Sequence, residues 1–200
     1  MAYSPNYSNL YVLRDAPSNR PFRGMFVNQD DWVFVKHYSG TKIPSQIICT
    51  QPASPRLYHE KIIEKFVSEG ISGWDVFEVD VLGKDDELFT GYFGLSIKGR
   101  CSPVDFSRSL IVNRDFPGGS FPYLKGRFFE DDYWDGSDIF MEDTGGAGGF
   151  QYCSERVKKL LVEEKVKSIK FERLIDFEID VNIIRSVSPE KLPKGIELTK

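Results

Sequence analysis

Apolar residues in this chain occur only in short runs. The longest are residues 10–13 and residues 32–35, four residues each. A helix that crosses a bilayer needs about 20 consecutive apolar residues, so no segment of this sequence is long enough to form one. The chain must bury its apolar residues through regular spacing instead, and that spacing predicts the elements of the fold.

The first segment with helical spacing covers residues 55–69. Ser54 suits the capping position, Pro55 suits the first helical position, and Gly70 follows the end. The buried face of this helix is expected to comprise Tyr58, Ile62, Ile63, Phe66 and Val67.

The second helical segment covers residues 155–167. Ser154 is the expected capping residue, and Lys165 and Lys167 suit the negative end of the helix dipole. Its buried face is expected to comprise Val157, Leu160, Leu161 and Val166.

Other segments are rich in β-branched and aromatic residues or alternate at period two, which predicts strands. Strands are expected at residues 10–13, 32–35, 77–81 and 93–97, and one or two more over residues 169–181. Residues 83–86 are the expected turn before the strand at 93–97, and residues 100–129 are expected to be loops with one short strand near 110–112. Strands and helices in this mixture predict an α+β fold with mostly antiparallel sheets.

The size and composition of the chain predict one folded unit. A chain of 200 residues equals one to one and a half typical domains. With 40% hydrophobic and 28% charged residues it has the composition of a globular protein. We expect a single domain over residues 1–200, with a β-rich N-terminal part at residues 1–53.

Negative charge is concentrated in two stretches. The net charge is −4, but residues 130–143 hold seven carboxylates and no basic residue, and residues 75–87 hold six carboxylates against Lys84 alone. No basic face of the kind that binds nucleic acid is evident. The stretch at 130–143 is either a solvated loop or a docking surface for a basic protein.

The docking interpretation names a set of candidate partner-binding residues. Tyr133 and Trp134 lie among the carboxylates, where they either anchor an interface or fold inward to hold the loop. The candidate residues are Glu130, Asp131, Asp132, Tyr133, Trp134, Asp135, Asp138, Glu142 and Asp143.

Catalytic and cofactor signatures are weak. His37 and His59 are the only histidines. Nothing near His37 in the sequence supplies a nucleophile with an orienting carboxylate, and His59 is expected on the first helix, beside its apolar face and exposed. We expect a protein that is not an enzyme and uses no cofactor; the alternative is a small cytosolic hydrolase or transferase that uses one of these histidines. A loop starting at Asp131 and ending at Glu142 partly fits a calcium-binding frame, but Tyr133 occupies a ligand position.

The N-terminus and the cysteines predict a cytoplasmic location. The first 22 residues lack the basic and apolar regions of a secretory signal. Cys49, Cys101 and Cys153 are odd in number and far apart, which suits free thiols. The glycine tract at residues 144–149 does not complete a phosphate-binding motif and is expected to be a connector.

Two segments carry a resemblance to a known family. SDIF at residues 137–140, followed after a variable stretch by SERVKKLLVEEKVKSIKFERL at 154–174, resembles bacterial immunity proteins of polymorphic toxin systems. The resemblance includes YFGLSIKGRCSPVDFSRS at 92–109, with Asp105 and Ser109, and takes in about half of the chain. The glycine tract and the acidic insert depart from the family pattern.

The resemblance implies a cytosolic antitoxin that binds and neutralises a cognate protein toxin, without catalytic residues, nucleic acid or membrane. A toxin that cuts nucleic acid needs a basic cleft for its polyanionic substrate. Clustered carboxylates would steer an inhibitor onto such a cleft, so the acidic stretch at 130–143 is the expected contact surface.

Overall fold

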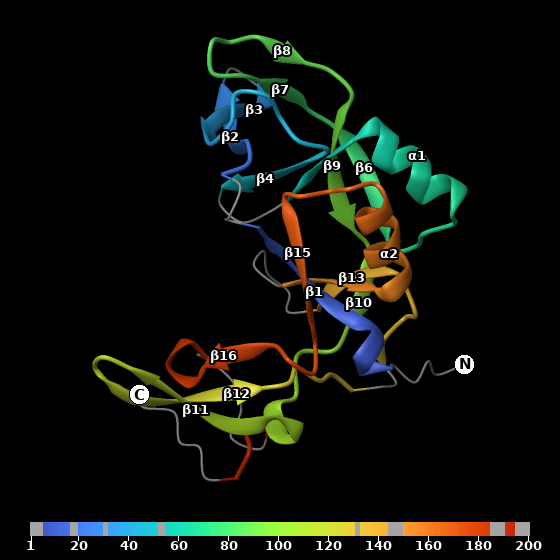
Figure 1. Cartoon of the computed structure of the whole chain (residues 1–200). Coiled ribbons are helices and arrows are strands. Elements are labelled where there is room, and N and C mark those ends of the chain that lie inside the picture. The colour runs from blue at the N-terminus through green and yellow to red at the C-terminus, as the bar shows by residue number, and fades with distance from the viewer. Residues whose placement is uncertain are drawn as a thin grey trace.

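The computed structural model describes residues 6–16, 20–29, 32–51, 55–130, 133–143, 150–184 and 191–194. These residues form three sheets, mostly antiparallel, and two α-helices (Figure 1). The predicted α+β fold class is confirmed. Neither of the two described helices is long and apolar enough to span a membrane.

A five-stranded sheet brings the first strand of the chain beside strands from its last quarter. Its strands are β1 (Leu10–Asp15), β10 (Gly99–Cys101), β13 (Ile139–Glu142), β14 (Gln151–Ser154) and β15 (Ile169–Arg173). In the order β10-β13-β14-β1-β15, only β10 and β13 are parallel neighbours. The first strand of the chain therefore lies between two strands from its last quarter, and both of these pair with it antiparallel.

An eight-stranded sheet contains the remaining strands of the first half of the chain. They are β2 (Arg23–Gln29), β3 (Trp32–Ser39), β4 (Ile47–Gln51), β5 (Leu57–His59), β6 (Trp74–Glu78), β7 (Asp80–Leu82), β8 (Leu88–Phe89) and β9 (Tyr92–Ile97). The described strands of residues 1–53 are thus divided between two sheets, with β1 in the five-stranded sheet and β2 to β4 here. The division into domains stays a prediction.

This sheet curls so that its two ends come close together. Its order is β6-β9-β5-β4-β2-β3-β7-β8, yet only Val79 separates β6 from β7. One residue spans at most about 3.6 Å, so the edge strand β6 must end beside β7. The alternation at residues 77–81 predicted one continuous strand; the structure divides it at Val79, because β6 pairs with β9 and β7 pairs with β3.

A three-stranded sheet occupies much of residues 100–129, where loops were expected; residues 102–105 and 126–129 are loops as predicted. It consists of β11 (Leu110–Phe116), β12 (Gly119–Lys125) and β16 (Glu178–Asp180), in the order β11-β12-β16. The sequence predicted one short strand near 110–112, whereas the structure has two strands of seven residues each in this region. Pro122 is tolerated within β12 because β16 pairs only with residues 123–125, which leaves β12 as an edge at that position.

Helix α1 (Glu60–Ser68) begins five residues later than predicted. Residues 57–59 form β5 instead, because both β4 and β9 offer them antiparallel partners. His59 caps the helix, its Nδ1 accepting a hydrogen bond from the Lys61 amide at 3.3 Å. The predicted capping residue Ser54 lies outside the described residues. Ile62 and Phe66 are buried as expected, whereas Val67 is 67% exposed.

Helix α2 (Glu155–Glu163) begins where predicted and ends four residues early. Ser154 occupies the capping position, but its hydroxyl donates to Asp138 at 2.7 Å instead of capping the helix. Lys165 and Lys167 lie beyond the helix end. The expected residues Val157, Leu160 and Leu161 are buried. Three short 3₁₀ helices complete the described elements: Tyr7–Asn9, Phe106–Arg108 and Val181–Ile183.

Both α-helices end in the same backbone motif, but with different residues. After α1 the amides of Gly70 and Ile71 bond back to the last turn, and Gly70 has φ +61°. After α2 the amides of Lys165 and Val166 do the same, and Lys165 has φ +57°. Left-handed backbone costs roughly 1 kcal/mol in a residue with a side chain and little in glycine.

Replacing Lys165 by glycine is therefore expected to stabilise the protein. We expect Lys165→Gly to raise the free energy of unfolding by about 0.5–1 kcal/mol, since the left-handed position after α2 then carries no Cβ. Urea unfolding followed by tryptophan fluorescence measures the change. The reciprocal variant Gly70→Lys should lose a similar amount, and a loss of stability in Lys165→Gly would contradict this account.

The largest core cluster lies among the helices and the two larger sheets. It comprises Tyr11, Leu13, Ile47, Cys49, Tyr58, Ile62, Phe66, Ile71, Leu95, Ile97, Ile139, Cys153, Val157, Leu160, Leu161 and Ile169. The buried Arg56 ties the same two sheets together, because its Nη2 donates to the Leu13 carbonyl at 3.2 Å and to Asp15 at 3.1 Å. Both sheets and both helices thus share one core.

Candidate functional site

The carboxylates of the acidic segment, residues 130–143, face in two directions. The segment leads from the end of β12 into β13, so its last part lies in the five-stranded sheet. Asp131 and Asp132 lie outside the described residues. Of the others, Trp134, Asp138 and Glu142 are buried or half-buried, and Glu130, Tyr133, Asp135 and Asp143 are exposed.

Asp138 connects the loop after α1 to the start of α2. Its carboxylate accepts hydrogen bonds from the Ser72 amide at 3.2 Å and from the Ser154 hydroxyl at 2.7 Å. Arg156 donates to the same carboxylate at 2.9 Å. Asp138 is only 7% exposed, so its charge is satisfied within the protein.

Glu142 belongs to a buried polar network. Its Oε1 accepts from Arg127 at 2.6 Å and from the Tyr152 hydroxyl, which Arg127 also contacts at 2.5 Å. Burial raises the pKa of Tyr152 well above its ordinary value, because the phenolate would lose its hydration. The Arg127 guanidinium also lies 4.5 Å from the centre of the Phe150 ring. This network holds β13, β14 and the segment after β12 together.

The two aromatic residues of the acidic segment take different positions. The Trp134 ring lies 5.3 Å from Phe140 and 6.3 Å from Phe129, among the buried residues of a second core cluster. Tyr133 is 67% exposed. Of the two interpretations left open above, Trp134 therefore folds inward, and Tyr133 is available to a partner.

The exposed carboxylates of this segment differ in the hydrogen bonds and ion pairs that they make. Asp135 accepts from the Arg100 amide at 2.9 Å and from the Ser137 amide at 3.0 Å. Glu130 lies 3.7 Å from the Lys191 ammonium. Together with Asp143 they are the carboxylates of the segment that the described structure leaves at the surface.

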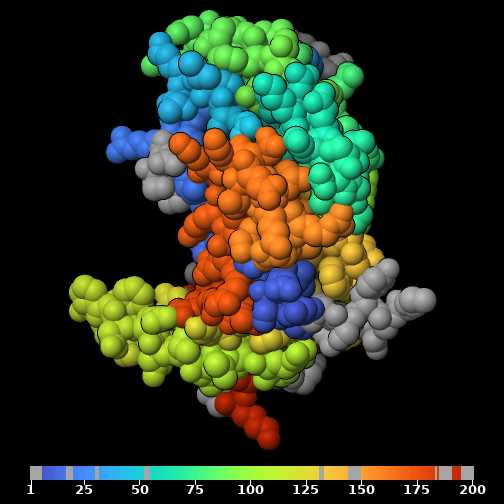
Figure 2. All heavy atoms as spheres, turned by 45° about the vertical axis from the view of Figure 1, so that its right-hand side comes forward, coloured from blue at the N-terminus to red at the C-terminus, as the bar shows by residue number. Residues whose placement is uncertain are grey.

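Figure 2 shows hairpin β11–β12 standing out from the rest of the molecule. Its inner face buries Leu124, whereas the opposite face exposes large apolar side chains. Leu110 is 66%, Phe116 50% and Phe121 37% exposed. The Phe116 ring lies 6.0 Å from Phe121 and 6.2 Å from Tyr123, so the aromatic side chains contact one another.

We call this surface the hairpin face; its residues are Leu110, Val112, Phe116, Phe121 and Tyr123. On this face the Arg114 guanidinium donates two hydrogen bonds to the Glu178 carboxylate, one of them 2.7 Å long. The Lys125 ammonium lies 3.5 Å from the Asp176 carboxylate. The hairpin face is apolar with paired charges, which is the composition of a protein interface core.

Sequence reasoning missed the hairpin face. Its signal was the pair Pro117 and Gly118, which suits a tight turn, between two segments that contain β-branched and aromatic residues, 110–116 and 119–125.

The histidines and cysteines have packing partners. His59 caps α1, and the His37 ring lies edge-on 4.9 Å from Phe22. Burial raises the pKa of Cys49 to about 12 and also raises the pKa of Cys101 and of Cys153. Thiols with raised pKa stay protonated and are poor nucleophiles. These surroundings favour structural roles for the residues that the hydrolase or transferase alternative would use.

The described part of the chain offers no assembled metal site. Within it, no group of three or more His, Cys, Asp or Glu side chains is placed to hold a metal ion. Of the calcium-like frame, Asp131 lies outside the described residues and Glu142 points to Arg127. The glycine tract at 144–149 also lies outside the described residues.

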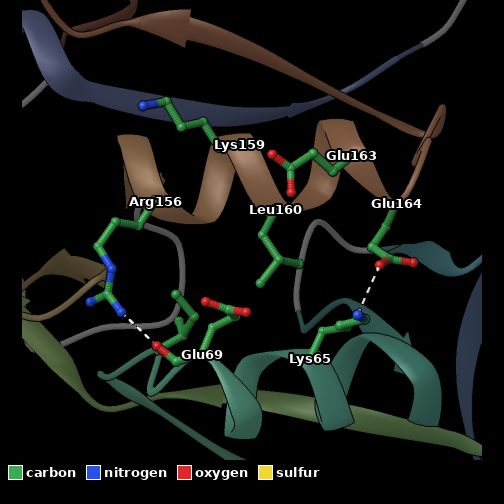
Figure 3. A pocket seen from close by; sticks show the side chains of 8 residues that line it. Lys65, Glu69, Arg156, Lys159, Leu160, Glu163 and Glu164 are labelled. Carbon is green, nitrogen blue, oxygen red and sulfur yellow. Dashed lines mark hydrogen bonds and ion pairs between the residues drawn. The ribbon is translucent and has the colours of Figure 1, made fainter.

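Among the surface hollows lined by described residues are two that contain neither a histidine nor a cysteine. One, of about 360 Å³, is lined by Arg20, Pro21, Arg23, Ser39 and Gly40. The other, of about 260 Å³, lies between α1 and α2 (Figure 3).

No model of a known protein family matches the chain, and no curated protein matches it. The functional interpretation therefore depends on the residues and surfaces described above.

Proposed function

We propose that this protein is an immunity protein, an antitoxin that binds a cognate bacterial toxin in the cytoplasm and covers its active or substrate-binding surface. The observation that carries the proposal is the hairpin face, whose large apolar side chains are exposed on a hairpin that projects from the molecule (Figure 2). Exposed apolar patches rimmed by polar groups are typical of protein–protein interfaces.

The composition of the hairpin face suits a partner protein. Phe116 and Phe121 are large, rigid side chains that lose little entropy on binding, and such residues dominate interface energetics. Because Arg114 and Lys125 are already paired, the face would not leave an unpaired charge beneath a partner.

The exposed carboxylates add an electrostatic component. Glu130, Asp135 and Asp143 stay at the surface in a protein of net charge −4. Negative charge accelerates association with a basic surface, such as the substrate cleft of a toxin that cleaves nucleic acid. Free thiols at Cys49, Cys101 and Cys153 suit a reducing cytoplasm.

Co-expression tests the proposal. The toxin to test is the product of a toxin-like reading frame, if one lies next to the gene for this chain. Cells that express only this product should die, and cells that also express the present chain should survive. Death in both cases, with both proteins present at comparable levels, would contradict the immunity function.

The hairpin face should carry much of the affinity. We expect the double variant Phe116→Ser, Phe121→Ser to bind the purified toxin about 10–100-fold more weakly, because interface hot spots contribute more than 1 kcal/mol each. Isothermal titration calorimetry measures the dissociation constant.

A matched control removes the same kind of side chain elsewhere. Val67 on α1 and Val162 on α2 are 67% and 57% exposed and lie outside the hairpin. The variant Val67→Ser, Val162→Ser should bind as tightly as the wild type. Equal affinities for both double variants would show that the hairpin face is not the contact surface.

A further inference from the structure

The hollow between α1 and α2 has an apolar floor. Ile71 and Leu160 form this floor, and each is 7% exposed. Figure 3 shows the Leu160 side chain pointing into the space between the two helices. Pockets for cofactors and drug-sized ligands usually enclose about 300–1,000 Å³. This groove of about 260 Å³ suits one long side chain better than a whole ligand.

Two of the cations that line the groove are already occupied. Lys65 lies 3.7 Å from Glu164 and closes one end of the groove. Arg156 closes the other end, where it donates to the Glu69 carbonyl at 2.6 Å and to Asp138 at 2.9 Å. These pairs hold the two helices at a fixed spacing, and they leave neither Lys65 nor Arg156 to neutralise other carboxylates.

Two carboxylates inside the groove stay without such partners. Neither Glu69 nor Glu163 makes a side-chain hydrogen bond or ion pair with another described residue. Figure 3 places them on opposite walls, Glu69 on the α1 side and Glu163 on the α2 side, with Leu160 between them. The Lys159 side chain points away from both. The groove therefore combines an apolar floor with one exposed carboxylate on each wall whose oxygens make no direct side-chain contact with a cation among the described residues.

We propose that this groove binds an arginine side chain of a partner protein. The methylene stem would lie on Leu160 and Ile71, and the guanidinium would reach between Glu69 and Glu163. Arginine fits because its stem packs on apolar surface and its planar head donates to two carboxylates at once. The identity of the partner as a basic toxin rests on the proposed function. The match between the groove and a guanidinium group is independent of that function.

An arginine analogue tests the groove without any partner. Nα-acetyl-L-arginine methylamide is titrated into the full chain, and the methyl signals of Ile71 and Leu160 are followed by NMR. We expect saturable shifts with a dissociation constant in the range of about 1–10 mM, as one side chain on an open surface allows. The norleucine analogue, which has the stem without the charge, should produce no saturable shift.

Variants separate the groove from general attraction. The double variant Glu69→Gln, Glu163→Gln keeps the shape of the walls and should weaken binding about tenfold. Glu64→Gln removes a carboxylate of α1 that does not line the groove, and should bind as the wild type does. Thermal unfolding of each variant confirms that the fold is intact.

The outcomes distinguish this proposal from the proposed function. Equal binding by the norleucine analogue, or unchanged binding in the double variant, would overturn the arginine site. Neither result affects rescue by co-expression. If rescue succeeds while the titration fails, the immunity function stands and the groove is not its arginine contact.

Discussion

Replacing Arg127 by methionine should cost about 3–5 kcal/mol of folding free energy. The substitution leaves Glu142, 8% exposed, without its cationic partner. An uncompensated buried charge is among the largest single destabilising effects in proteins. In a chain of this size the loss should lower the melting temperature by roughly 10 °C. Thermal and urea unfolding measure both quantities.

The whole network can be removed as a control. The triple variant Arg127→Met, Glu142→Leu, Tyr152→Phe replaces all three polar groups by apolar groups of similar size. The triple variant leaves no buried charge unpaired, and only the Val104 amide, which donates to Glu142 at 3.3 Å, loses its acceptor. It should therefore be more stable than Arg127→Met alone. A triple variant as unstable as the single one would show that shape, and not charge pairing, dominates at this place.

Asp138→Ala should be the second most damaging change, with a loss of about 2–3 kcal/mol. Ser72 and Ser154 lose their common acceptor, and hydrogen bonds to a charged group contribute about 1.5–3 kcal/mol. Asp143→Ala is the matched control, since it removes an exposed carboxylate five positions later and should change stability by at most about 0.5 kcal/mol. Urea unfolding compares the two variants.

The result would also separate stability from binding within the acidic segment. If Asp138→Ala is as stable as the wild type, its carboxylate does not tie α2 to the loop after α1. Loss of toxin protection in a fully folded Asp143→Ala variant would instead place that carboxylate in the contact surface.

Periodicity in the sequence predicted the parts of the fold that depend on local patterns. The buried residues of α2 have helical spacing, and Ile169 and Phe171 alternate with polar residues as a strand requires. Such patterns record which face of an element meets the core. They carry no information about which strands become neighbours.

Tertiary pairing explains the main differences. Residues 57–59 fit a helical pattern, but β4 and β9 recruit them as strand β5. In the hairpin, Pro117, Gly118 and Pro122 indicated loops. The first two form the turn, and the third lies in β12 at a position that β11 pairs but β16 does not. Local breakers mark where a chain turns, but not how long the flanking strands are.

The candidate site could be predicted only as a region. Seven carboxylates in fourteen residues are visible in the sequence, but not which of them face inward. That depends on Arg127, Tyr152 and Arg156, which approach only in the folded chain. The arginine groove is invisible for the same reason, because Glu69 and Glu163 belong to different helices.

The position of β1 in the five-stranded sheet imposes a delay on the nascent chain. Leu13 pairs with Gln151 and Phe171, so β1 meets its neighbours only after most of the polypeptide has been made. At about 5–20 residues per second the ribosome needs on the order of ten seconds to deliver them. Until then β1 has no neighbouring strands, and its apolar side chains stay exposed. A chaperone that shields these side chains during translation should raise the yield of folded protein.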